Sequence, residues 1–354
     1  MDLIVDILST MLTQLQKPTL AFLVGGMLLA ALGSKLVVPD QAYKLIVLLL
    51  LLKVGLGAGI SVREANLVEL AVPAVAAAFA GVLIVLLGGR TLARFKGVSQ
   101  VDGMATAGLF GAVSASTLAA GMAVLDDGGI FYEGFIGALY PFMDIAALVT
   151  AIVLAKLSAE RSVAPALQAD GTATATLTGG TGSRSAIETR VVTDILVDTF
   201  RSPAISALML GLAIGVFARP ETVYAGFYEP LFRGLLSVLM LVMGIEAWSR
   251  LSELRKVAHA YILYGLTAPI IHGLIGFGFG LAAHHLTGFS AGGIVLLSVM
   301  AASSSDISGP PTMRAALPKA NPSAYVGTST GLGTPVAILS IPLFMSLADY
   351  FVGF

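Results

Sequence analysis

The chain has 354 residues, of which 56% are hydrophobic and 12% are charged, and its formal net charge at pH 7 is −1. Long apolar runs recur along nearly its whole length, which is typical of a polytopic membrane protein. It contains no cysteine. A disulfide framework, a thiolate metal site and a cysteine nucleophile are therefore excluded.

In chain order, the first sixteen residues carry Asp2 and Asp6 in place of a basic region, so we expect a retained amphipathic segment and not a signal peptide. Ten apolar segments follow, which we predict to be membrane-spanning helices. They lie near residues 18–34, 43–62, 67–89, 101–123, 134–157, 202–218, 230–248, 258–283, 290–312 and 330–351. Residues 158–190, rich in Ser, Thr, Gly and Ala, are predicted to form a flexible cytoplasmic linker.

The two sets of five segments resemble each other. Pro18 with Gly26 matches Pro203 with Gly211, and Gly57 matches Gly244, at an offset of 185 to 187 residues. An odd number of spans per unit makes the second unit enter the membrane from the opposite side. We therefore predict an all-α polytopic membrane protein whose ten transmembrane helices form a 5+5 inverted repeat, residues 1–157 and 191–354. The alternative is chance similarity among apolar helices.

Hydroxyl clusters interrupt the fourth and ninth segments at corresponding places, 189 residues apart. A helix broken inside a bilayer exposes backbone groups that lipid cannot satisfy, so a break survives only around a site lined by protein, water or ions. We therefore predict two discontinuous helices that share one binding site. The clusters are Ser114, Ala115, Ser116 and Thr117, and Ser303, Ser304, Ser305 and Asp306.

The chemistry of these clusters suits an anion beside a cation. A half-helix that begins at such a break directs free N–H groups and a partial positive charge at a small anion. Hydroxyl, carbonyl and carboxylate oxygens suit an alkali cation. We expect the anion at Ser114 to Thr117 and Ser303 to Ser305, and the cation at Asp306, Ser304, Ser116 and Asp144. Alternatively, the hydroxyls bond back to their own helices, and Asp144 caps the helix that starts near Pro141.

The distribution of lysine and arginine predicts the orientation. With the amino terminus outside, four of these residues face out and fifteen face in, which is a strong positive-inside bias. Both termini are then periplasmic. The outer four are Lys17, Arg63, Arg219 and Arg233, and the inner fifteen are Lys35, Lys44, Arg90, Arg94, Lys96, Lys156, Arg161, Arg184, Arg190, Arg201, Arg250, Arg255, Lys256, Arg314 and Lys319.

The remaining polar residues of the apolar segments carry weaker signals. Lys53 and Glu246 are expected to form an interhelical ion pair or to extend to the membrane interface. His272 is expected to be a packing histidine, with a proton relay as the alternative. Gly309-Pro310-Pro311 is expected to end or kink its helix. No catalytic motif is present, so we do not expect an enzyme.

Several longer strings are familiar, among them Gly108-Leu109-Phe110-Gly111-Ala112-Val113-Ser114, Ala138 to Asp144, Gly226 to Gly234, Met243 to Arg250 and Ala302 to Pro311. Through them the chain resembles the cyanobacterial sodium-dependent bicarbonate transporter family, SbtA, over nearly its whole length except the linker.

This resemblance implies a symporter in the plasma membrane of a cyanobacterium that imports bicarbonate with sodium as the coupling ion, for inorganic-carbon concentration. No other cofactor and no nucleic acid is expected. It implies a homotrimer, a gate domain of segments 1, 2, 6 and 7, and a core domain of segments 3–5 and 8–10 that moves like an elevator. It also implies a cytoplasmic PII-like partner that senses adenine nucleotides. The alternatives are a symporter for a small organic anion, and a channel or receptor.

Overall fold

The computed structural model describes residues 16, 18–92, 94–169, 203–254 and 259–354, with the single positions 193, 197, 200 and 201. Every regular element in this part of the chain is a helix. The prediction of an all-α protein is thus confirmed for these residues. The amphipathic segment predicted at the amino terminus lies outside the described residues, apart from residue 16.

The helices follow the predicted apolar segments closely. The first half contains α2 (Pro18–Ala31), α3 (Asp40–Glu64), α4 (Leu67–Leu92), α5 (Gln100–Gly111), α6 (Ala115–Gly128), the 3₁₀ helix η1 (Gly134–Leu139) and α7 (Tyr140–Ala169). The second half contains α9 (Pro203–Phe217), α10 (Glu221–Val223), the π-helix η2 (Tyr224–Tyr228), α11 (Glu229–Leu254), α12 (His259–Thr287), α13 (Ala291–Ala302), α14 (Gly309–Ala316), α15 (Pro322–Val326), the π-helix η3 (Gly327–Gly333), α16 (Thr334–Leu339) and α17 (Ile341–Phe351).

Within the described ranges, seven helical stretches are long and apolar enough to cross a membrane. Three further apolar helices are shorter, namely Pro18–Ala31, Ile205–Phe217 and Ala291–Ala302. A bilayer of about 30 Å needs about 20 helical residues. The chain is therefore a multi-pass membrane protein, while the count of ten spanning helices stays a prediction.

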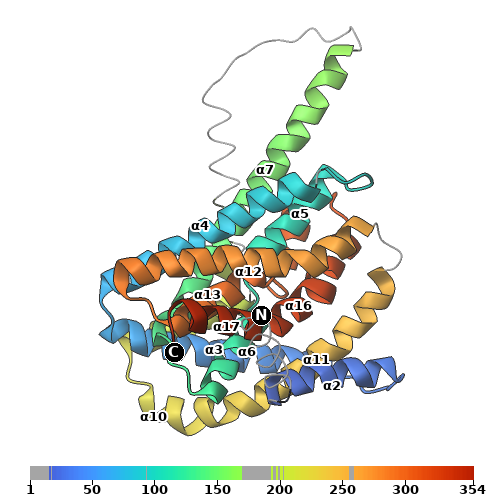
Figure 1. Ribbon diagram of the computed structural model, residues 1–354. Coiled ribbons are helices and arrows are strands. Elements are labelled where there is room, and N and C mark those ends of the chain that lie inside the picture. The colour runs from blue at the N-terminus through green and yellow to red at the C-terminus, as the bar shows by residue number, and fades with distance from the viewer. Residues whose placement is uncertain are drawn as a thin grey trace.

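The boundary between the first repeat and the linker differs from the prediction. Helix α7 continues to Ala169, so residues 158–169 are helical and not irregular. This part of α7 projects beyond the other helices (Figure 1). Apolar content is what marked the predicted end of the segment, and an amphipathic or polar extension of a helix carries no such mark. Residues 170–190 of the predicted linker lie outside the described part of the chain.

Two helix crossings depend on glycine. Gly26 of α2 packs directly on the backbone of α11, where a Cβ atom would meet the Leu241 carbonyl oxygen, and Gly244 of α11 faces the Leu23 carbonyl in return. Small residues allow two backbones to approach this closely, and van der Waals contact then holds helices together in a bilayer.

Helices α3 and α9 cross in the same way, with Gly55 and Gly59 of α3 against Gly211 and Gly215 of α9. Gly55 therefore makes the contact that corresponds to that of Gly244. Gly57, which the sequence comparison paired with Gly244, instead faces the Tyr224 hydroxyl, 2.8 Å from a Cβ built at this glycine.

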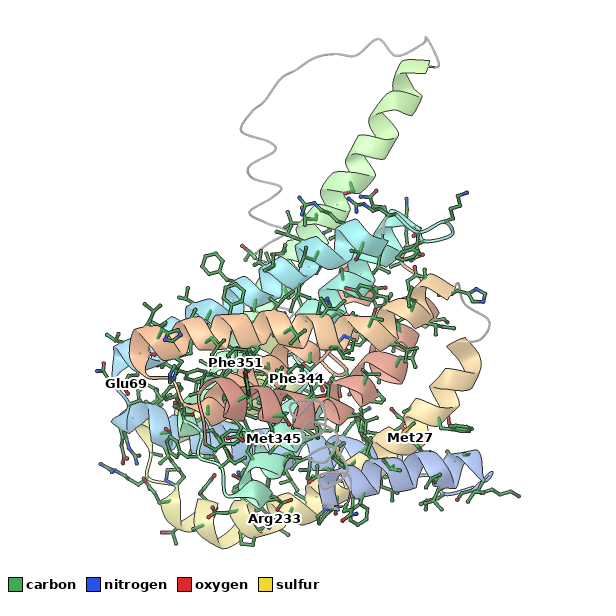
Figure 2. All side chains as sticks on the ribbon, viewed as in Figure 1. Met27, Glu69, Arg233, Phe344, Met345 and Phe351 are labelled. Atoms are coloured by element: carbon green, nitrogen blue, oxygen red, sulfur yellow. The ribbon has the colours of Figure 1, made fainter. Side chains whose placement is uncertain are left out.

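The other helices pack together around α5, α6 and α13, whose residues are almost entirely buried. Helices α4, α7, α12 and α17 surround them. Phe344 and Met345 of α17 lie inside this group, whereas Arg233 of α11 lies at the edge of the molecule (Figure 2). The predicted site residues lie within this group of helices around α5, α6 and α13.

Candidate functional site

The first interruption comprises residues 112–114, between the end of α5 at Gly111 and the start of α6 at Ala115. Ala112 and Ser114 have extended backbone dihedrals. Ser114 is the N-cap of α6: its hydroxyl oxygen accepts hydrogen bonds from the Thr117 backbone N–H at 3.1 Å and from the Thr117 hydroxyl at 3.0 Å. Serine is favoured at this position because it satisfies a first-turn amide.

The second interruption comprises residues 303–308, between the end of α13 at Ala302 and the start of α14 at Gly309. Ser303 is extended, and its hydroxyl donates to the Met300 carbonyl at 2.7 Å. Pro310 and Pro311 lie in the first turn of α14, so they begin a helix and do not end one as expected. Proline suits a first turn because the N–H groups there have no partner within the helix.

The two interruptions are in direct contact. The Ser114 backbone N–H donates to the Ser303 hydroxyl oxygen at 2.9 Å, and the Ser116 hydroxyl donates to the Asp306 carboxylate at 2.6 Å. The Ser305 N–H donates to the Leu109 carbonyl of α5 at 2.8 Å. Except for the partly buried Asp306, the predicted cluster residues are buried. The structure therefore brings the two predicted clusters to one place.

Asp144, near the start of α7, links the two interruptions from one side. One carboxylate oxygen accepts the Val113 N–H of the first interruption at 3.1 Å, and the other accepts the Ser308 hydroxyl of the second at 3.2 Å. Its side chain is fully buried. Hydrogen bonds of this kind fix the relative position of two irregular segments, because a buried amide without an acceptor costs free energy.

Further hydroxyl residues, absent from the predicted site, line the same region. The Ser304 hydroxyl contacts the Ser329 carbonyl at 3.1 Å and the Thr334 hydroxyl at 3.3 Å. Ser308, next to Asp144, belongs to the second interruption. The signal for Ser329 was the hydroxyl run from Thr328 to Thr330, but the tenth apolar segment was predicted to begin only at residue 330.

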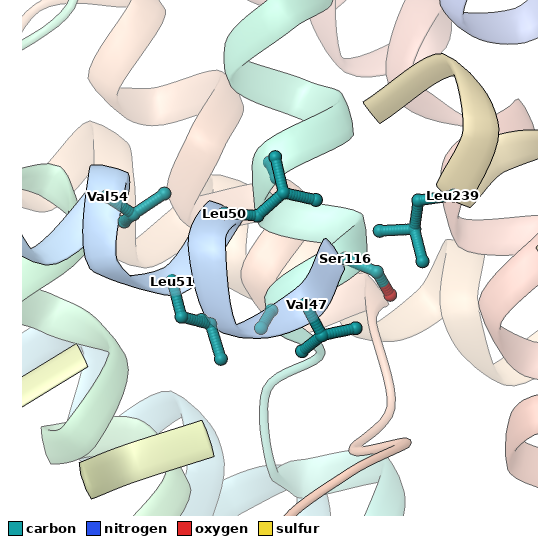
Figure 3. Close-up of a pocket in the computed structure, with 8 residues that line it drawn as sticks. Val47, Leu50, Leu51, Val54, Ser116 and Leu239 are labelled. Atoms are coloured by element: carbon teal, nitrogen blue, oxygen red, sulfur yellow. The ribbon is translucent and has the colours of Figure 1, made fainter. Parts of the chain in front are cut away.

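A small cavity of about 10 Å³ separates this site from α3 and α11. Its walls are Ala115, Ser116 and Ala119 on one side and Val47, Leu50, Leu51, Val54 and Leu239 on the other. Figure 3 shows Ser116 between Val47 of α3 and Leu239 of α11. The polar cluster thus faces an apolar wall built from the helices of the two glycine crossings.

The charges at the site are few. The described residues contain no group of three or more histidine, aspartate or glutamate side chains that could hold a metal ion. The carboxylates in contact with the two interruptions are those of Asp306 and Asp144. The amino terminus of α6 adds about half a positive charge, which favours an anion in front of Ala115.

Lys53 and His272 lie elsewhere. The Lys53 ammonium group is buried over the Phe232 ring, 4.1 Å from its centroid, and the ion pairs among described residues are Arg63 with Glu221 and Arg233 with Asp127. Lys53 thus packs on an aromatic ring, and the expected pair with Glu246 is absent from these residues. The His272 ring packs edge-on against Phe110 and Tyr264, as expected for a packing histidine.

Buried hydroxyls, two carboxylates and a helix amino terminus gathered between two interrupted helical segments define the class of protein as a membrane transporter that handles small ions. The comparison with protein families agrees: residues 18–349 match the family model described as the Na⁺-dependent bicarbonate transporter superfamily. The chain belongs to this family of transporters, which are not enzymes. No curated protein matches the chain.

Proposed function

We propose that the chain is a sodium-bicarbonate symporter that binds both ions where the two interruptions meet. The observation that supports this most is the pair of hydrogen bonds that joins the interruptions, from Ser114 to Ser303 and from Ser116 to Asp306. Family membership supports sodium and bicarbonate as the transported ions.

Each interrupted pair, α5 with α6 and α13 with α14, is proposed to be one discontinuous transmembrane helix within a 5+5 inverted repeat of ten helices. Matching contacts support the repeat. Helix α2 crosses α11 on glycine as α9 crosses α3, and α3 contacts η1 as α11 contacts η3. Corresponding elements thus keep corresponding partners.

The same helix contacts support a division of the protein into a gate domain and a core domain. Helices α2, α3, α9 and α11, joined by the glycine crossings, would form the gate, and the remaining helices would form the core that carries the ions. The wall of α3 and α11 that faces Ser116 is apolar. Such a wall gives a polar site nothing to bind, so it suits an elevator movement in which the core slides past the gate.

In this proposal the bicarbonate lies at the amino terminus of α6, near Ser114, Ala115 and Thr117, with Ser303 to Ser305 across from it. Sodium lies at Asp306 and Ser116, whose oxygens are already adjacent. Ser304 and Asp144 complete the predicted sodium set. The side chains of Ser304 and Asp144 form hydrogen bonds with other protein groups. Each would therefore either give up one of these bonds to bind sodium, or orient the sodium ligands without contacting the ion.

Coupling has a simple energetic reason. Moving one bicarbonate into a cell that is negative inside costs about 2.3 kcal/mol per 100 mV, before any concentration gradient. One sodium per bicarbonate cancels this charge. The sodium gradient then drives uptake, provided that the core does not cross with a bare Asp306 carboxylate, whose transfer through the bilayer is costly.

The setting of this activity is proposed as follows. The protein lies in the plasma membrane of a cyanobacterium with both termini periplasmic, assembles as a homotrimer, and supplies inorganic carbon for concentration. A cytoplasmic PII-like protein regulates it. The excess of lysine and arginine on one side supports the orientation.

The experiment is labelled bicarbonate uptake into proteoliposomes with and without a sodium gradient. The Asp306→Asn variant keeps the size of the side chain and removes its charge, so sodium-dependent uptake is expected to be lost. Asp126→Asn is the matched control, because Asp126 is exposed and its carboxylate accepts a hydrogen bond from the Tyr132 hydroxyl, which belongs to neither interruption. Size-exclusion profiles of both variants should equal that of the wild type. Wild-type sodium dependence in Asp306→Asn would contradict the assignment.

A small organic anion is the second candidate substrate, since a helix dipole does not distinguish bicarbonate from acetate. Family membership favours bicarbonate. Excess acetate or pyruvate should leave labelled bicarbonate uptake unchanged. Competition by either would shift the proposal to organic anions, while unsaturable flux would indicate a channel.

A further inference from the structure

A second, larger cavity lies on the other side of the molecule, between α4 and α12. It has a volume of about 310 Å³. The two helices run side by side across Figure 1. The walls are mostly apolar, and Leu263 and Ile271 are 52% and 54% exposed. The hydroxyls of Thr91 and Thr267 bond to carbonyls of their own helices, so they need no partner from the cavity.

This cavity is elongated along the helices. It reaches from Leu87 on α4 to Phe95 in the turn that follows this helix, and on α12 from His272 back to Leu263. The nine-residue step on α12 corresponds to about 14 Å at the rise of an α-helix. A groove of this length on the outer surface of a membrane protein accommodates a large part of one acyl chain.

Three basic residues lie close in sequence to groove-lining residues at one end of the groove. Arg94 and Lys96 flank Phe95, which lines the groove, and Arg90 lies one turn earlier on α4. All three cations are exposed. No carboxylate of the described residues forms an ion pair with them, since the ion pairs found there involve Arg63 and Arg233. The buried rings of Tyr264 and His272 form part of the inner wall of the groove.

We propose that this groove binds an anionic phospholipid of the cytoplasmic leaflet. The phosphate of the head group lies at Arg90, Arg94 and Lys96, and one acyl chain lies between α4 and α12. The arrangement fits no other occupant as well: a neutral lipid leaves the cations unpaired, and a soluble phosphate leaves the apolar groove open. Clusters of lysine and arginine at the cytoplasmic surface of a membrane attract the negatively charged head groups of anionic lipids.

The position of the groove gives the lipid a route to the transport site. Tyr264 and His272 pack on Phe110, with ring centroids 5.0 and 6.1 Å apart. Phe110 in turn lies against Gly333, where a Cβ would be 2.6 Å from the ring and 3.1 Å from the Ser304 hydroxyl oxygen. An acyl chain in the groove therefore supports, from behind, the aromatic rings that pack against the site.

The test measures lipid binding to the purified full-length chain, by native mass spectrometry and by thermal unfolding in detergent. Phosphatidylglycerol, phosphatidylcholine with the same acyl chains, and glycerol 3-phosphate are titrated separately. The head-group variant combines Arg90→Gln, Arg94→Gln and Lys96→Gln. Its matched control removes three exposed cations of the same membrane side elsewhere, by Lys35→Gln, Lys44→Gln and Lys319→Gln. A groove-filling variant is Thr267→Trp.

The wild type is expected to bind phosphatidylglycerol in preference to phosphatidylcholine. Each removed cation should weaken phosphatidylglycerol binding about fivefold, and the head-group variant therefore about a hundredfold, with the control variant unchanged. Thr267→Trp should weaken the binding of both lipids.

Equal binding of the two lipids by the wild type, or an equal loss in the control variant, would overturn the proposal. So would stabilisation by glycerol 3-phosphate alone, which would indicate a phosphate site, or full binding by Thr267→Trp. None of these readouts uses bicarbonate uptake, so failure here is distinct from failure of the proposed transport function.

Discussion

Replacement of Ser303 by alanine tests whether the two interruptions hold each other in place. The Ser303 hydroxyl accepts the Ser114 backbone N–H at 2.9 Å and donates to the Met300 carbonyl at 2.7 Å, and the side chain is fully buried. Alanine leaves the Ser114 N–H without its acceptor. A buried donor that loses its partner costs about 1–3 kcal/mol. Because this amide lies at the start of α6, uptake should fall together with stability.

The assay compares Ser303→Ala with Ser298→Ala. Ser298 lies on α13, the helix that Ser303 follows, and is equally buried, and its hydroxyl donates to the Ile294 carbonyl one turn earlier. Thermal unfolding in detergent should show a decrease of a few degrees in Tm for Ser303→Ala, as expected for 1–3 kcal/mol in a chain of this size. Ser298→Ala should stay within about 0.5–1 kcal/mol of the wild type, since its own carbonyl keeps the helical bond. Equal losses in the two variants would refute the reasoning.

Two further predictions concern packing and capping. Gly26→Val places a side chain against the α11 backbone and should lower Tm strongly, whereas Gly25→Val, with no atom within 4 Å of its Cβ, should not; similar Tm values would contradict the role of this crossing. Glu133→Ala removes the acceptor of the Ser290 N–H and hydroxyl at the start of α13 and should destabilise the protein by about 0.5–2 kcal/mol. Glu69→Ala, in the first turn of α4, is its control. An equal loss of stability in that variant would mean that the lost charge, and not the lost hydrogen bonds to Ser290, causes the effect.

The positions of the helices could be predicted because the relevant signal is local. Runs of apolar residues locate the long helices, though not the short elements α10, η2 and α15, and small residues with hydroxyls mark the regions of the two interruptions, 112–114 and 303–308. The repeat predicted that the two hydroxyl clusters share one site, since related elements of two repeats meet near their axis. The particular contact between Ser116 and Asp306 was not predicted.

Other features could not be read from the pattern because they depend on partners distant in the sequence. Asp144 remained ambiguous until Val113 and Ser308 were seen on its two oxygens. The ring over which Lys53 lies comes from Phe232, 179 residues away in the chain, and no periodicity of α3 indicates it. The extension of α7 was missed because its composition resembles that of a linker.

The most direct test of the account is a density map of the protein in lipid with sodium and bicarbonate present. The account predicts density for a planar anion in front of the amino terminus of α6 and for a cation within bonding distance of the Asp306 carboxylate and the Ser116 hydroxyl. Ion density elsewhere, with the hydrogen bonds between the two interruptions unchanged, would contradict it.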